Sequence, residues 1–180
     1  MTPKNILLGV SGSISAYKAC DIVSGLTKLG HQVKVILTDG GAQFITPMSL
    51  QVLSKHPVYT HMFSENDPTS IMHIDLPKWA DMFVIAPATA NIIGKIAGGI
   101  ADDLLSATAL VAQSQCIKVI APAMNTHMYD SPAVQANLQT LRQLRYQVIE
   151  PREALLACGD YGQGALATVP DILDTLQNLG

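Results

Sequence analysis

A short polar turn, Ser11-Gly12-Ser13, carries residue types that could bind an anion. Its glycine allows a backbone to approach a ligand closely, and its hydroxyls can cap a helix or donate to a phosphate. The free N–H groups and the dipole of a helix that begins here would point at the same ligand. These residues therefore predict a cradle for a nucleotide or a phosphorylated cofactor.

The elements that must position this turn lie on either side of it. Residues 6–10 form a short apolar run typical of a buried parallel strand, and apolar residues at helical spacing follow from Ile14 to Leu29. The turn lacks the Gly-x-Gly-x-x-Gly pattern of dinucleotide folds, and no Gly-Lys-Ser/Thr follows to make a P-loop. A plain tight turn between a strand and a helix is the alternative at this point.

The residue after the second apolar run, 33–37, favours one class of cofactor. A dinucleotide fold would often place an acid there for the ribose, whereas this chain has Thr38. A hydroxyl suits a phosphate better than a ribose diol. The sequence therefore predicts a mononucleotide such as FMN rather than NAD.

Further along the chain, two more expected strands end in small or polar residues, at 87–91 and 122–125. The carboxyl ends of parallel strands lie at one edge of a sheet, where open α/β folds bind ligands. Each of these loops alone could be a helix cap or a proline turn. Together with Ser11 to Ser13 and Thr38, they predict a pocket.

Composition narrows the class of protein. The chain has 180 residues, 48% of them hydrophobic and 14% charged, with a formal net charge of −3 and no basic cluster. We therefore expect one domain that binds no nucleic acid and that uses part of its apolar surplus in subunit contacts. No apolar run approaches the roughly 18 residues that a membrane span needs, and the N-terminus lacks an apolar signal core. We expect no membrane partner.

The three cysteines, Cys20, Cys116 and Cys158, are far apart and form no C-x-x-C pair. An odd number of scattered cysteines favours a reducing compartment, here the cytoplasm. We assign Cys20 and Cys116 to the core, and we assign no metal ligands.

Strand and helix patterns alternate along the chain, as in doubly wound sheets. We predict a single α/β domain: a three-layer, Rossmann-like (flavodoxin-like) open parallel sheet with helices on both faces. The sequence also predicts a polar loop at 65–70, a helix capped by Asp102 that runs to Ala112, and a long loop at 151–164. The expected strands are 6–10, 33–37, 58–59, 82–86, 118–121 and 147–149.

Five segments resemble, in order and spacing, the flavin-dependent cysteine decarboxylases, and most closely those that act on phosphopantothenoylcysteine in a stand-alone form. The resemblance covers essentially the whole chain, and the Pro-Ala-Met-Asn and Ala-Cys-Gly-Asp motifs are its most diagnostic parts. The segments are Ser11–Lys18, His73–Asp81, Ala86–Asn91, Ala121–Asn125 and Ala157–Gly162.

This resemblance implies an FMN-dependent carboxy-lyase of coenzyme A biosynthesis that converts phosphopantothenoylcysteine to phosphopantetheine. The substrate would be oxidised to a thioaldehyde, lose carbon dioxide, and be reduced again as an enethiolate. The family also implies a homotrimer, with a dodecamer as a further assembly. Bifunctional relatives carry a ligase domain after this one, so we expect ligation to be done by a separate polypeptide.

The resemblance assigns roles residue by residue. His73 acts in the oxidative half-reaction, as a base or by orienting the thiolate, and Cys158 is the cysteine of a substrate lid at about 151–164. Asn125 binds the substrate carboxylate. The remaining substrate contacts are Ala157, Gly159 and Asp160. The expected flavin contacts are Gly12, Ser13, Ile14, Thr38, Thr89, Ala90, Asn91, Ser106 and Met124.

Three alternatives come from related flavoproteins. A flavin prenyltransferase would share the fold but lack the two diagnostic motifs. A peptidyl-cysteine decarboxylase would share the histidine and the asparagine but differ in the lid. A non-catalytic flavin-binding regulator would carry an acidic tail, and we expect no such tail here.

Overall fold

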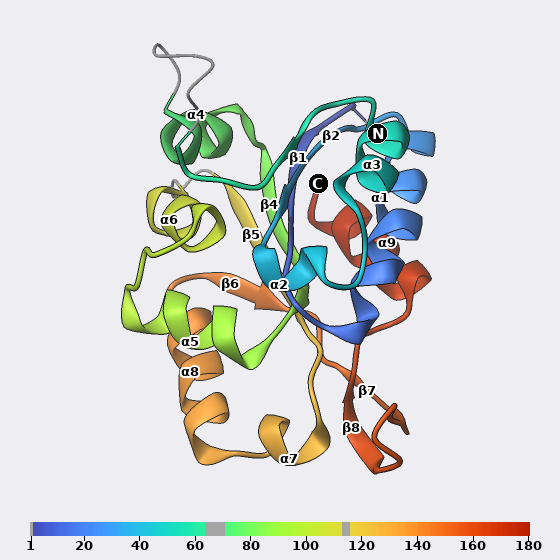
Figure 1. Cartoon of the computed structure of the whole chain (residues 1–180), viewed down its shortest axis with the longest axis vertical. Coiled ribbons are helices and arrows are strands. Elements are labelled where there is room, and N and C mark those ends of the chain that lie inside the picture. Colours follow the sequence, from blue (N-terminus) through green and yellow to red (C-terminus); the bar gives the residue numbers. More distant parts are fainter. Residues whose placement is uncertain (1, 64–70, 113–115) are drawn as a thin grey trace.

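The computed structural model describes residues 2–63, 71–112 and 116–180. Its centre is a six-stranded sheet in the order β3-β2-β1-β4-β5-β6, in which all neighbouring strands are parallel (Figure 1). The polar loop expected at 65–70 lies outside the described residues. The strands are β1 (Asn5–Val10), β2 (Gln32–Leu37), β3 (Val58–Tyr59), β4 (Met82–Ala88), β5 (Ile117–Pro122) and β6 (Tyr146–Val148).

The central strands are covered on both faces, as their continuous apolar runs predict. Ile6 and Leu8 of β1 point into one apolar core, whereas Leu7 between them points into the other, and all three are completely buried. In register, Leu8 pairs with Val35 of β2 and with Val84 of β4. The predicted three-layer parallel fold is therefore confirmed.

Helices complete the two outer layers. The core that contains Ile6 is covered by α1 (Ala19–Lys28), α3 (Pro47–Ser54) and α9 (Val169–Leu179). The opposite core is covered by α4 (Met72–Trp79), α5 (Ala90–Gly98), α6 (Leu104–Val111) and α8 (Pro132–Gln143). Short helical turns follow the strand ends, namely the 3-10 helix η1 (Ile14–Lys18), α2 (Asp39–Ala42) and α7 (Thr126–Tyr129).

The expected cap of α6 is wrong by one residue. Asp103, not Asp102, precedes the helix, and its carboxylate accepts a hydrogen bond of 2.8 Å from the backbone N–H of Ser106. The Ser106 hydroxyl in turn accepts from the backbone N–H of Asp103, which completes a capping box. Asp102 instead pairs with Lys95.

The prediction of a long loop at 151–164 is also wrong, because this segment contains a β-hairpin. The strands β7 (Arg152–Leu155) and β8 (Tyr161–Ala165) pair antiparallel. Glycine weakens a strand signal, and β8 contains two glycines, Gly162 and Gly164. These glycines allow β8 to pack against the chain that follows β5, where the Met124 N–H donates to the Gly164 carbonyl over 2.9 Å. The hairpin lies beside α7 at the carboxyl end of the sheet (Figure 1).

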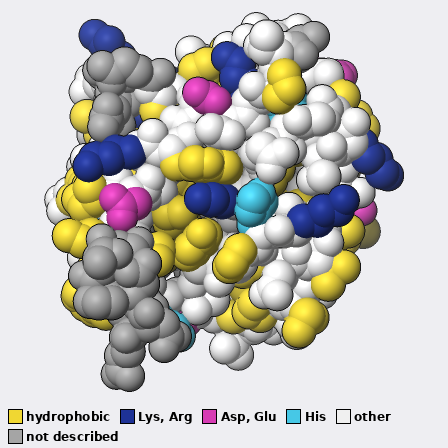
Figure 2. All heavy atoms as spheres, turned by 90° about the horizontal axis from the view of Figure 1, so that it is seen from above, with side chains coloured by type: hydrophobic (Ala, Val, Ile, Leu, Met, Phe, Trp, Pro, Cys, Tyr) yellow, Lys and Arg dark blue, Asp and Glu magenta, His cyan; other side chains and the backbone are white. Residues whose placement is uncertain are grey.

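In Figure 2, the basic side chains of one face stand apart among apolar, acidic and uncharged ones. Among the helices of the described ranges, none is long and apolar enough to cross a membrane.

Candidate active site

A cavity of about 1150 Å³ opens at the carboxyl edge of the sheet. Its wall includes residues that follow β1, β2, β4 and β5, together with part of the β7–β8 hairpin. The predicted meeting of four strand ends in one pocket is therefore confirmed. Pockets for drug-sized ligands measure about 300–1,000 Å³, so this cavity is large for a single small molecule.

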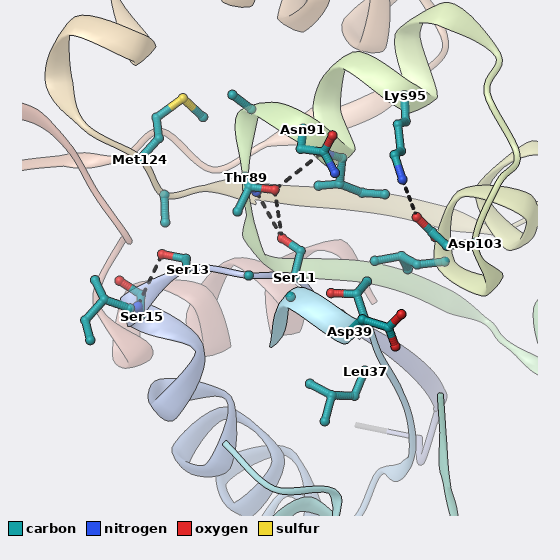
Figure 3. A pocket seen from close by; sticks show the side chains of 18 of the residues that line it. Ser11, Ser13, Ser15, Leu37, Asp39, Thr89, Asn91, Lys95, Asp103 and Met124 are labelled. Carbon is teal, nitrogen blue, oxygen red and sulfur yellow. Dashed lines mark hydrogen bonds and ion pairs between the residues drawn. The ribbon is translucent and has the colours of Figure 1, made fainter. Parts of the chain in front are cut away.

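Ser11 joins the ends of the two central strands. Its buried hydroxyl donates to the Pro87 carbonyl over 2.8 Å and accepts from the Thr89 N–H over 3.0 Å. Figure 3 shows Ser11 and Thr89 facing each other across the strand ends. Because these hydrogen bonds hold β1 and β4 in place, the serine fixes the shape of the cradle.

Three other hydroxyl groups on the cavity wall act as helix caps, which was the alternative interpretation of these loops. Ser13 accepts from the Ser15 N–H over 3.2 Å, Thr38 from the Gly41 N–H over 3.1 Å, and Thr89 from the Ile92 N–H over 3.4 Å. The capped helix N-termini thus lie on the cavity wall, where their partial positive charge favours an anionic ligand. Capping and ligand binding are compatible at these positions.

Gly12 leaves no space for a side chain. A Cβ atom added there would lie 2.9 Å from the carbonyl carbon of Gly40, in the short helix α2 that follows β2. The turn after β1 and the first turn of α2 therefore pack backbone to backbone on the wall of the cavity. A cradle lined by backbone rather than by side chains suits a phosphate group.

Most of the predicted flavin contacts lie on this wall, and their contacts with a cofactor stay predictions. Ser106 is different. Its side chain is buried under the start of α6, where its hydroxyl donates to the Asp103 carbonyl over 3.1 Å, and it is not part of the wall. The predicted contacts on the wall are Gly12, Ser13, Ile14, Thr38, Thr89, Ala90, Asn91 and Met124.

An ion-pair cluster on the cavity wall was not predicted from the sequence. Lys95 Nζ lies 2.7 Å from a carboxylate oxygen of both Asp102 and Asp103. Figure 3 shows the contact of Lys95 with Asp103. Burial alone would lower the pKa of Lys95, but the hydrogen bonds to these carboxylates raise it. The cluster joins α5 to α6. A lysine on one helix followed by two acids before the next is the only signal the sequence holds for it.

Asn125, Cys158 and Asp160 come together although more than thirty residues separate the first from the others. Asn125 Nδ2 donates to Asp160 Oδ2 over 2.8 Å and to Cys158 Sγ over 3.1 Å, while Cys158 Sγ donates to Asp160 Oδ2 over 3.3 Å. The hydrogen bond from Asn125, followed by that from Cys158, lowers the pKa of Asp160. The tip of the hairpin is therefore held on the Asn125 side chain.

The other predicted substrate contacts lie at the hairpin tip. Ala157 lines the cavity. Gly159 has a φ of +92°, in the left-handed region that favours glycine, and its N–H donates to the Leu156 carbonyl over 2.9 Å. Gly159 thus makes the turn that brings Cys158 and Asp160 back toward Asn125.

His73 lies apart from this cluster. It is the second residue of α4 and is half-buried, and it does not line the cavity. Its Nδ1 atom is buried without a hydrogen-bond partner among the described residues. Within one chain, the structure therefore brings Asn125 and Cys158 together but leaves His73 elsewhere.

The doubly wound sheet and the backbone-lined cavity at its carboxyl edge define the class of mononucleotide-binding α/β proteins. Within that class the chain belongs to the Flavoprotein family, whose sequence profile matches residues 1–179.

Similar proteins of known name include a probable decarboxylase. The chain is 48% identical over 174 residues to a probable phosphopantothenoylcysteine decarboxylase of Streptococcus mutans, covering 97% of each chain. It is 51% identical over 170 residues to the coenzyme A biosynthesis bifunctional protein CoaBC of Bacillus subtilis, covering 94% of this chain and 41% of that protein. The chain therefore spans less than half of the bifunctional relative.

Solved structures show the same fold. A cysteine-to-serine variant of a PPC decarboxylase, complexed with pantothenoylaminoethenethiol, superposes with a TM-score of 0.88 and 32% identity, over 99% of this chain and 98% of that one. The FMN-binding protein AtHal3 superposes with a TM-score of 0.85 and 32% identity, over 99% of this chain and 97% of that one.

Proposed function

We propose that this protein binds FMN and decarboxylates phosphopantothenoylcysteine to phosphopantetheine in the cytoplasm. The observation that carries the proposal is the contact of Asn125 Nδ2 with a carboxylate and a thiol beside a cavity whose wall also includes the phosphate-suited cradle. The similarity to a phosphopantothenoylcysteine decarboxylase over 97% of both chains supports the substrate. All three cysteines are free, which fits a reducing compartment.

The cavity fits FMN. The Gly12 turn and the capped helix N-termini at Ser13 and Thr89 would hold the phosphate and the ribityl chain, and Asn91 and Met124 would contact the ring. When bound, the flavin supplies a two-electron oxidation of the substrate and returns the same electrons at the end. The hairpin residues that line the same cavity would then face the substrate.

In this mechanism Asn125 binds the substrate carboxylate. The Asn125 amide already donates to a carboxylate, that of Asp160, over 2.8 Å. The substrate carboxylate would take the place of Asp160 and release the hairpin tip, so substrate binding and lid movement are linked. Asn125 would then hold the carboxylate in one orientation, which aligns the C–C bond for cleavage.

Cys158 supplies a proton after carbon dioxide has left. Once the thioaldehyde has lost carbon dioxide, the carbon that carried the carboxylate needs a proton and the carbon that carries sulfur needs a hydride. Because Cys158 Sγ lies 3.1 Å from the Asn125 amide, it is close to the place where the carboxylate was held. A thiol, with an ordinary pKa of about 8.5, is a suitable acid, and water can reprotonate its thiolate between turnovers.

His73 would serve the cavity of a neighbouring subunit in a homotrimer, with a dodecamer as a further assembly. Two observations support this proposal: His73 is absent from the cavity wall of its own chain, and large apolar side chains are exposed. The exposed apolar residues include Phe44, Met48, Val52, Ile71 and Ile100.

Complementation tests this sharing of the site. Co-expressed chains that carry His73→Asn or Asn125→Asp, each with its own tag, are expected to form active mixed oligomers. If His73 and Asn125 of each site come from different chains, about a quarter of the sites in randomly mixed oligomers keep both groups. If both groups come from one chain, no mixed site is complete and decarboxylation stays absent.

FMN binding tests the cradle. Gly12→Ala is expected to weaken FMN binding about tenfold or more, because the added Cβ lies 2.9 Å from the Gly40 backbone and the two backbones must separate. The matched control is Gly98→Ala in α5, where the added Cβ makes only an ordinary contact at 3.9 Å. Fluorescence titration with FMN measures both, and circular dichroism checks the fold. Equal FMN affinity in the two variants would contradict the assignment.

Carbon dioxide release tests the proposed reaction against the main alternative. The FMN-loaded protein is expected to release carbon dioxide from phosphopantothenoylcysteine and not from a short peptide that ends in cysteine. Release from the peptide alone would identify a peptidyl-cysteine decarboxylase.

A further inference from the structure

We propose that Lys18 and Arg152 form the binding site for the phosphate group of the substrate. This inference rests on the proposed function and assigns the specificity for a phosphorylated substrate to two named side chains. Lys18 is the last residue of η1, and Arg152 is the first residue of β7, yet both line the same cavity. The fold therefore places two cations from distant parts of the chain on one wall.

Neither cation has an acidic partner in the described ranges. The ion pairs found there involve Lys95 and Arg142. Arg152 Nε donates to the Leu166 carbonyl over 3.3 Å, which fixes the guanidinium and leaves its two terminal nitrogens for another acceptor. A fixed guanidinium fork matches the oxygens of a phosphate.

The two charges affect each other. Burial, followed by the charge of Arg152, lowers the pKa of Lys18. A phosphate monoester carries a charge of about −1.5 to −2 at pH 7, so a phosphate between the two cations would replace their repulsion by two attractions. The pair is thus better suited to a bound dianion than to solvent.

The position of the pair fits the far end of the substrate rather than the flavin. The phosphate of FMN is assigned to the turn at Gly12 and Ser13, whereas Arg152 begins the strand that leads to Cys158. The four residues of β7 span about 10 Å at 3.3 Å per residue. Phosphopantothenoylcysteine is a long molecule with its phosphate at one end and its cysteine at the other, and it would lie along this strand between the cation pair and Asn125.

The test compares a phosphorylated substrate with the same molecule without phosphate. The variants are Lys18→Gln, Arg152→Gln and the double variant, and the matched control is Lys28→Gln, an exposed lysine of α1 that is not on the cavity wall. Each FMN-loaded protein is assayed with phosphopantothenoylcysteine and with pantothenoylcysteine. The affinity for FMN is measured separately.

We expect the wild-type protein and Lys28→Gln to prefer the phosphorylated substrate. Each cavity substitution should lower kcat/KM for phosphopantothenoylcysteine about tenfold and the double variant about a hundredfold, through KM, with little change for pantothenoylcysteine. Equal losses on both substrates would overturn the proposal. So would a loss of FMN affinity with an unchanged preference, because the pair would then bind the flavin phosphate.

Binding of phosphopantothenate and pantothenate, measured by calorimetry, separates this proposal from the proposed function. If the wild-type protein binds the phosphorylated compound more tightly and the double variant does not, the phosphate site stands even where no carbon dioxide is released. If the double variant keeps the full preference, the phosphate site is wrong whether or not decarboxylation occurs.

Discussion

The Asn125→Asp variant is expected to bind FMN normally and to leave it oxidised when phosphopantothenoylcysteine is added. An aspartate keeps the size of the side chain but sets a carboxylate against the substrate carboxylate, where the amide now donates to a carboxylate over 2.8 Å. Loss of a hydrogen bond to a charged group, together with this repulsion, should lower kcat/KM by about a thousandfold or more. Stopped-flow absorbance of the flavin measures the first half-reaction directly.

His73→Asn should stop the reaction at the same stage for a different reason. The imidazole would accept the proton of the substrate thiol, and an amide cannot accept that proton at neutral pH. A binding titration separates the variants, because Asn125→Asp should bind substrate weakly whereas His73→Asn should still bind it. Bleaching of the flavin at the wild-type rate in either variant would show that the assigned role is wrong.

Replacing Cys158 by serine is expected to separate the two halves of the reaction. The variant should bind FMN, bleach it with substrate and release carbon dioxide, because none of these steps uses the thiol. A serine hydroxyl is too weak an acid to protonate the remaining carbon. The product should therefore be the oxidised enethiol, lighter than phosphopantetheine by two hydrogens, with the flavin left reduced.

The matched control is Cys20→Ser in α1, whose side chain is half-buried and lies outside the cavity wall. It should yield normal phosphopantetheine. Mass spectrometry distinguishes the proposed role from a merely loosened hairpin, in which both half-reactions slow together and the product is unchanged. Normal phosphopantetheine at a rate that matches carbon dioxide release would remove Cys158 from the chemistry.

Most of the fold could be predicted because its signals are local. Continuous apolar runs such as 6–10 mark strands that are buried on both faces, and helical spacing marks the covering helices. The convergence of four strand ends then follows from parallel topology alone. Each of these loops could be interpreted as a helix cap or as part of a ligand pocket. Ser13, Thr38 and Thr89 cap helices and also lie on the cavity wall, so both interpretations hold.

The parts that the sequence could not predict depend on geometry between distant residues. Asp102 and Asp103 are identical as residue types, and only the backbone places Asp103 at the cap of α6 and both acids against Lys95. The β7–β8 hairpin was not predicted because its glycines have a low strand propensity. Packing of these glycines against the chain after β5 stabilises the strand in the folded protein. The separation of His73 from Asn125 is likewise a property of the folded chain.

A single-turnover experiment without oxygen tests whether the bound flavin takes part in the decarboxylation. Oxidised FMN-loaded protein is mixed with phosphopantothenoylcysteine labelled in its carboxyl group, while flavin absorbance, labelled carbon dioxide and product mass are followed together. We expect transient bleaching of the flavin, one carbon dioxide per substrate, full return of the oxidised spectrum, and phosphopantetheine as the product. Carbon dioxide release with no change in the flavin spectrum, or a flavin that never takes part, would contradict this expectation.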